Sequence, residues 1–112
     1  MYNIDHIKKA LGISGVRTNN YAWVSENNMA QIDLVIERDD GLTNICEEKY
    51  TDTEFSVSAE YEKALLKKMN IFRVETKTKN ALKLVMICAE NLSGKANTEH
   101  ITRVLTLDDL FN

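Results

Sequence analysis

The chain of 112 residues is 44% hydrophobic and 28% charged, and its formal net charge is −3. This length is sufficient for one globular domain with its own core and too short for two. The longest apolar run, residues 84–89, falls far below the roughly 20 residues of a membrane-spanning helix, and the chain opens without a secretory pattern. A slightly acidic chain also differs from a stand-alone nucleic-acid binder, which usually carries a basic excess. We therefore expect one cytoplasmic domain that does not enter a membrane.

Two elements are expected before residue 30. Residues 4–11 place apolar side chains at helical spacing, which predicts a short helix. Residues 21–25 are aromatic and β-branched, which predicts a strand. We expect one of the two aromatic residues of this strand, Tyr21 or Trp23, to pack in the core, with stacking against a nucleic-acid base as the alternative.

A hairpin is expected next. Residues 30–37 alternate apolar and polar side chains, which predicts a strand with one buried face and with Gln31, Asp33 and Glu37 on the other face. The turn at residues 38–42 contains an Asp-Gly pair, which is a strong hairpin signal before the apolar strand at residues 43–49. The two strands should therefore lie side by side.

The second half of the chain begins with a long helix over residues 59–77. Ser58 is its expected N-cap, and its apolar stripe consists of Tyr61, Leu65, Met69 and Phe72. Residues 81–89 predict a buried strand, 91–97 a loop, 101–105 a last strand, and 108–111 a helical turn. The order helix, three strands, helix, two strands predicts an α/β fold with a mixed central sheet flanked by helices.

The two cysteines, Cys46 and Cys88, each lie in an apolar strand pattern and lack the spacing of a metal-binding pair. We expect them to be reduced core thiols. The long helix carries six basic residues against three acidic ones between residues 59 and 79. A solvated helix face is the expected reading of this excess, and a phosphate-contacting face is the alternative; the basic residues are Lys63, Lys67, Lys68, Arg73, Lys77 and Lys79.

Asp33, Glu47 and Lys49 form the most informative pattern in the chain. Side chains alternate along a strand, so Glu47 and Lys49 should point to one face and Glu48 to the other. Two carboxylates can bind Mg²⁺ through hard oxygen ligands, and a nearby ammonium can orient or polarise a water. The pattern therefore predicts a metal-dependent site for cutting a phosphodiester, and the alternative is a solvated strand face with a cross-strand ion pair.

The order of elements, with Asp33 on the second strand and Glu47-x-Lys49 on the third, resembles the αβββαβ core of the restriction-endonuclease-like PD-(D/E)xK superfamily. Five stretches resemble more closely one group within it, the C-terminal domain of unknown function of predicted archaeal-type ATPases, which also occurs in bacteria. These stretches are residues 10–16 (ALGISGV), 30–36 (AQIDLVI), 45–50 (ICEEKY), 72–78 (FRVETKT) and 105–111 (LTLDDLF).

The resemblance implies a role for each residue of the pattern. Asp33 and Glu47 would bind Mg²⁺, with the main-chain carbonyl of Glu48 as a third ligand. Lys49 would lie beside the attacking water or the transition state. Gln31, two residues before Asp33, would contact the scissile phosphate.

Nucleases of this superfamily often have a further acidic active-site residue in the first helix. The acidic residue of the expected helix is Asp5, and the alternative reading of Asp5 is favourable charge at a helix N-terminus.

The resemblance also implies that residues 1–112 are one nuclease-like domain at the C-terminal end of a larger P-loop ATPase. Ser93-Gly94-Lys95 lacks the first glycine of a phosphate-binding loop, so ATP would bind only to the upstream domain. The expected function is to bind or cut DNA with Mg²⁺. The alternative is a non-catalytic module that docks on the ATPase domain or on a partner protein.

Overall fold

A computed structural model of the protein describes residues 4–50, 56–89 and 100–111. Its elements along the chain are α1 (Ile4–Ala10), β1 (Thr18–Val24), β2 (Gln31–Arg38), β3 (Leu42–Lys49), α2 (Ala59–Thr76), β4 (Ala81–Cys88), β5 (Ile101–Leu105) and α3 (Leu107–Phe111). This order confirms the α/β fold expected from the sequence. The predicted loop at residues 91–97 lies outside the described residues.

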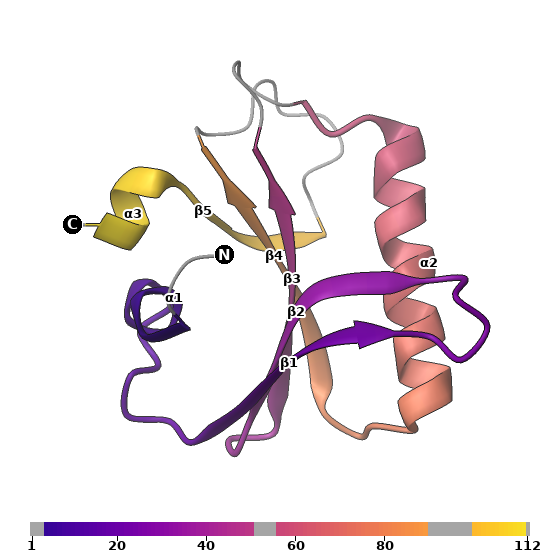
Figure 1. Cartoon of the computed structure of the whole chain (residues 1–112), viewed down its shortest axis with the longest axis horizontal. Helices are drawn as coiled ribbons and strands as arrows, with labels where there is room; N and C mark the ends of the chain where they lie inside the picture. Colours follow the sequence, from indigo (N-terminus) through magenta and orange to yellow (C-terminus); the bar gives the residue numbers. More distant parts are fainter. Residues whose placement is uncertain (1–3, 51–55, 90–99, 112) are drawn as a thin grey trace.

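The five strands form one mixed sheet in the order β1-β2-β3-β4-β5. The first three strands are an antiparallel meander, whereas β4 runs parallel to both β3 and β5. Helix α2 covers one face of the sheet, and the short helices α1 and α3 lie against the other (Figure 1). None of the described helices is both long and apolar enough to cross a membrane.

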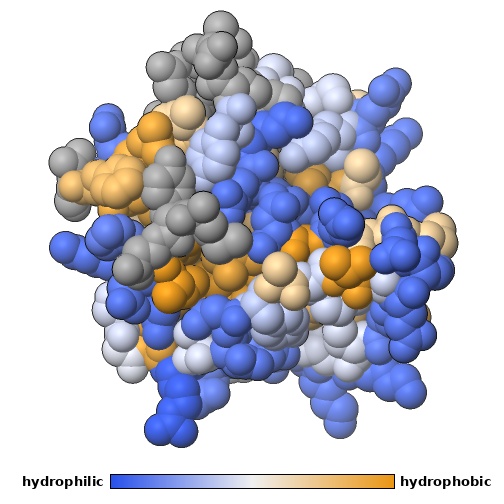
Figure 2. Space-filling model, in the orientation of Figure 1, coloured by the Kyte–Doolittle hydropathy of each residue, from blue (hydrophilic) through white to orange (hydrophobic). Residues whose placement is uncertain are grey.

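Each face of the sheet has its own core. The α2 side buries Ile32, Val35, Ile45, Leu65, Phe72, Leu84, Met86 and Cys88. The α1/α3 side buries Ile7, Ile13, Leu34, Ile36, Cys46, Val85, Ile87, Leu105 and Leu110. Both cysteines are unpaired and buried, as predicted. In the view of Figure 2, hydrophobic residues are spread in a broken band across the face, with hydrophilic residues between and around them.

The prediction of one buried face for β2 is wrong, because a β-bulge changes the alternation. Tyr21 pairs with Val35, but Trp23 pairs with Ile32, so Asp33 and Leu34 together lie opposite Ala22. Consequently Ile32 packs on the α2 side, although Leu34 packs on the α1/α3 side. Both faces of β2 are covered, and the bulge sets the direction in which Asp33 leaves the strand.

The hairpin between β2 and β3 forms as predicted. Gly41 in the turn has a φ of 87°, a conformation that glycine adopts without strain. The strands pair from Glu37 opposite Thr43 to Leu34 opposite Cys46. Asp33 and Glu47 are the next residues beyond the last of these pairs, where β2 turns away from β3 (Figure 1).

Helix α2 begins and ends at residues suited to those positions. The Ser58 hydroxyl accepts a hydrogen bond of 3.0 Å from the N–H of Tyr61, as expected of an N-cap. The helix ends at Thr76, one residue before the predicted end, and Lys77 caps it in the left-handed conformation. The predicted apolar stripe faces the sheet, and Phe72 meets Trp23 edge-on with ring centroids 5.1 Å apart. Core packing is therefore the observed role of Trp23.

Replacing Ser58 with alanine should lower the free energy of unfolding by about 1 kcal/mol, because the Tyr61 N–H loses its acceptor. Chemical denaturation measures this change. Ser56→Ala is the matched control, since Ser56 is exposed and lies outside the helix. Equal stability of the two variants would contradict the capping role of Ser58.

Candidate functional site

Glu47 is a buried carboxylate in the centre of the sheet. Glu47 is only 4% exposed. Because side chains alternate along β3, Glu47 points to the α2 side of the sheet, like Ile45, whereas Cys46 points to the other side. A buried charge requires a partner, and the partner is Lys68 of α2. The Lys68 ammonium lies 2.8 Å from Oε1 of Glu47 in an ion pair.

The pKa of Glu47 reflects these surroundings. The pKa of the carboxyl is raised from its ordinary value of 4.5 to about 7. Burial is the largest cause of this rise, Lys68 opposes it, and the charge of Asp33 adds to it. The pKa rises overall because the cost of desolvating the carboxylate exceeds its attraction to the Lys68 ammonium.

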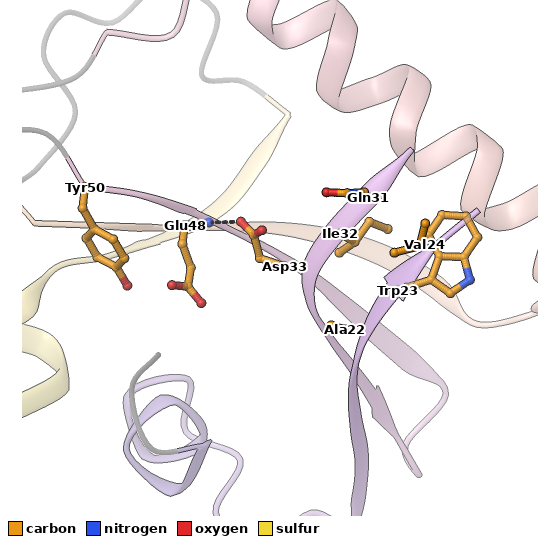
Figure 3. A pocket seen from close by; sticks show the side chains of 8 residues that line it. All are labelled: Ala22, Trp23, Val24, Gln31, Ile32, Asp33, Glu48 and Tyr50. Atoms are coloured by element: carbon orange, nitrogen blue, oxygen red, sulfur yellow. Dashed lines mark hydrogen bonds between the residues drawn. The ribbon is translucent and has the colours of Figure 1, made fainter. Parts of the chain in front are cut away.

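Asp33 is exposed and lies at the bulge of β2. Its Oδ2 accepts a hydrogen bond of 2.9 Å from the main-chain N–H of Glu48 (Figure 3). This bond occupies an N–H of β3 beyond the last β2–β3 pair. It also holds the Asp33 carboxylate across the gap between the two strands, next to Glu47.

Lys49 and Tyr61 complete the cluster on the α2 side. The Lys49 ammonium lies over the ring of Tyr61, 5.7 Å from its centroid, a distance at which a cation is attracted to an aromatic face. Burial raises the pKa of Tyr61 to about 12, and the charges of Glu47 and Asp33 add to the rise. We call Asp33, Glu47, Lys49, Tyr61 and Lys68 the acid cluster.

An open groove of about 510 Å³ reaches Asp33 from the side of β1. Gln31 lines it from the same strand. The other lining residues come from all three strands of the meander and from the residue after β3: Ala22, Trp23, Val24, Ile32, Glu48 and Tyr50 (Figure 3). Glu47 and Lys49 do not line the groove. Asp33 is therefore the residue shared by the groove and the acid cluster.

Glu48 meets Asp33 through its N–H, whereas its carbonyl was expected at the site. In a strand the N–H and the C=O of one residue point toward the same neighbouring strand. The Glu48 carbonyl is therefore directed to the same side as Asp33. Its side chain lines the groove.

Asp5 and the histidines His6 and His100 are not part of the acid cluster. Asp5 is exposed on α1, which packs against the face opposite to α2 (Figure 1). His6 contacts Phe111, and His100 Nδ1 lies 3.0 Å from Glu62 Oε2. Among residues 4–50, 56–89 and 100–111, no group of three or more His, Cys, Asp or Glu side chains is arranged to hold a metal ion.

Sequence reasoning did not assign a site role to Lys68 or Tyr61. Tyr61 was counted only in the apolar stripe, and Lys68 only among the basic residues of a solvated face. Their spacing gives a usable signal, because residues 61 and 68 are seven apart and so lie on one side of a helix. A lysine on the side of the helix that packs on the sheet needs an acidic partner there.

The comparisons with known proteins support the fold and give no information on function. No family model matches the chain, and no curated protein matches it. A solved structure titled "Crystal Structure of Protein of Unknown Function AF1548" is similar to it, with a TM-score of 0.58 and 15% sequence identity. The likeness covers 96% of this chain and 62% of that chain. This chain thus corresponds to less than two thirds of that protein.

The raised pKa of Glu47 makes the stability of the protein depend on pH. Between pH 4.5 and about 7 the folded chain binds more protons than the unfolded one, so the contribution of Glu47 is complete below this window and is lost as the pH rises through it. Relative to Glu47→Gln, the unfolding free energy of the wild type should fall by about 1.4 kcal/mol per pH unit there.

Chemical denaturation at several pH values in this range, without divalent cations, measures how steeply the free energy of unfolding changes with pH. A constant difference in stability between variants does not affect this slope. Glu60→Gln, at an exposed glutamate of α2, is the matched control and should keep the wild-type slope. Equal slopes for the wild type and Glu47→Gln would contradict the assigned pKa.

Proposed function

We propose that the chain is a nuclease-like domain that binds Mg²⁺ at Asp33 and Glu47 and cuts or holds a DNA phosphodiester there. The observation that supports this proposal is the hydrogen bond from the Glu48 N–H to Asp33, which holds this exposed carboxylate beside the buried residue Glu47 at the point where β2 and β3 separate. Lys49 lies on the Glu47 side of β3 and so supplies a positive charge to the same cluster.

The donor set suits magnesium better than other common metals. Mg²⁺ keeps several of its waters and is usually bound through one or two carboxylates together with substrate phosphates. Asp33 and Glu47 are the two carboxylates, and the carbonyl of Glu48 is directed toward the same side. The raised pKa of Glu47 supports this assignment, since a cation would stabilise the charged form that burial disfavours. Bound Mg²⁺ would supply Lewis-acid chemistry at a phosphate oxygen and an activated water.

The residues of the chain would then position the substrate. Asp33 and Glu48 line the groove and repel a phosphate in the absence of a cation, so binding of DNA depends on metal. Gln31 is exposed in the same groove and can donate its amide N–H to a phosphate oxygen. Lys49, held over Tyr61, would stabilise the negative charge that develops during cleavage.

The proposal also covers the larger protein to which this domain would belong. As the C-terminal PD-(D/E)xK domain of a cytoplasmic ATPase, the chain would contact an upstream domain that alone binds ATP. The similar fold of a longer protein supports a setting in which this unit is one part of a larger chain.

Lys49→Ala and Glu47→Gln should each lower the rate of DNA nicking by about 100-fold or more, because each removes a charge that acts on the developing transition state. Conversion of supercoiled plasmid in Mg²⁺ or Mn²⁺ measures the rate. Lys83→Ala is the matched control for Lys49, since Lys83 is exposed on β4 and pairs with Asn44, far from Glu47 along β3. Unchanged nicking in Lys49→Ala and Glu47→Gln would exclude this site.

A second candidate function is a non-catalytic docking module. Large apolar side chains are exposed near the β1–β2 turn, with Met29 63% and Val24 48% exposed. Val74 of α2 is 67% exposed, and its neighbour Glu75 accepts a hydrogen bond from the turn residue Glu26. A Mg²⁺ titration followed by NMR separates the two functions. Resonances of Asp33 and Glu47 that do not move in millimolar Mg²⁺ would favour docking.

A further inference from the structure

Lys68 lies between the buried carboxylate and a second groove. Its side chain is 26% exposed, whereas that of Glu47 is 6% exposed. The second groove has a volume of about 190 Å³ and is lined by Met29, Ala30, Ala64, Lys67, Lys68 and Ile71. The long stem of Lys68 thus reaches from the rim of this groove to Glu47, as amphipathic side chains do at an apolar surface.

The position of the ammonium has a consequence for any cation that binds Glu47. At 2.8 Å from Oε1, Nζ of Lys68 occupies the approach to that oxygen. Two cations cannot lie against one carboxylate without strong mutual repulsion in a poorly solvated place. A divalent ion that binds both Asp33 and Glu47 therefore competes with Lys68 for the Glu47 carboxylate.

We propose that Lys68 is the resident counter-cation of Glu47, which a divalent cation displaces from the carboxylate, so that Lys68 sets the metal affinity of the site. This inference rests on the proposed function. Free protein keeps the buried acid neutralised by its own lysine, and metal binding exchanges that partner for another.

The surroundings of Lys68 allow it to leave. Its stem is flexible and already partly exposed at the second groove, where the ammonium can regain water. Asp33, by contrast, is held by the Glu48 N–H and stays in place as the second ligand.

The test compares Lys68→Met with Lys67→Met by calorimetric titration with Mg²⁺ and Mn²⁺. Methionine keeps an unbranched stem and removes the charge. Lys67 is an exposed neighbour on the same helix that lines the same groove, so Lys67→Met controls for the general loss of one positive charge. Titration at about pH 9 keeps Glu47 ionised in all proteins.

We expect Lys68→Met to bind Mg²⁺ about tenfold more tightly than Lys67→Met, a coupling of ordinary size. Lys68→Arg, which keeps the ion pair, should bind like the wild type. Equal affinities of Lys68→Met and Lys67→Met would overturn the inference and leave the proposed function standing. Metal binding that is absent, or that persists in an Asp33→Asn/Glu47→Gln double variant, would overturn the proposed function itself.

A measurement on the wild type covers the case in which Lys68→Met does not fold. During a Mg²⁺ titration, the side-chain carbon resonances of Lys68 should shift with the same midpoint as those of Asp33 and Glu47. Lys68 resonances that stay fixed while the carboxylates titrate would show that the ion pair survives metal binding, and the inference would be wrong.

Discussion

The buried charge of Glu47 is the constraint on which the site depends. A carboxylate inside a sheet is costly unless a cation or hydrogen-bond donors compensate it. In this fold α2 supplies the cation through Lys68, 2.8 Å away. The pair contributes little net stability, because desolvation of both charges offsets their attraction. An apolar residue at position 47 would serve packing at least as well, and the proposed function gives the acid a role as a metal ligand.

The β-bulge in β2 is the second structural device of the site. It turns the strand so that Ile32 and Leu34 pack on different faces, and it leaves Asp33 where β2 and β3 separate. The Glu48 N–H, which has no strand partner on that side, binds the Asp33 carboxylate. Bulges commonly redirect a side chain next to a functional site. Here the redirected side chain joins the open groove to the buried acid.

The sequence predicted most of the fold because its signals are local. Alternation, the Asp-Gly turn and the Ser58 cap each depend on a few neighbouring residues. The bulge was missed because alternation at Ile32, Leu34 and Ile36 looks regular, and the pairing with β1 that breaks it is not local. Asp33, Glu47 and Lys49 were chosen as a candidate site from their types and spacing. Lys68 was missed because helical spacing can place it on the side of α2 that faces the sheet but does not identify Glu47 of β3 as its partner.

The central claim is that Asp33 and Glu47 together bind one divalent cation. A crystal of the protein grown with Mn²⁺, with data collected at the manganese absorption edge, tests this claim most directly. The account predicts an anomalous peak between the two carboxylates, with the Lys68 ammonium withdrawn from Glu47. A map without a peak at this position, with Lys68 still against Glu47 at saturating Mn²⁺, would contradict it.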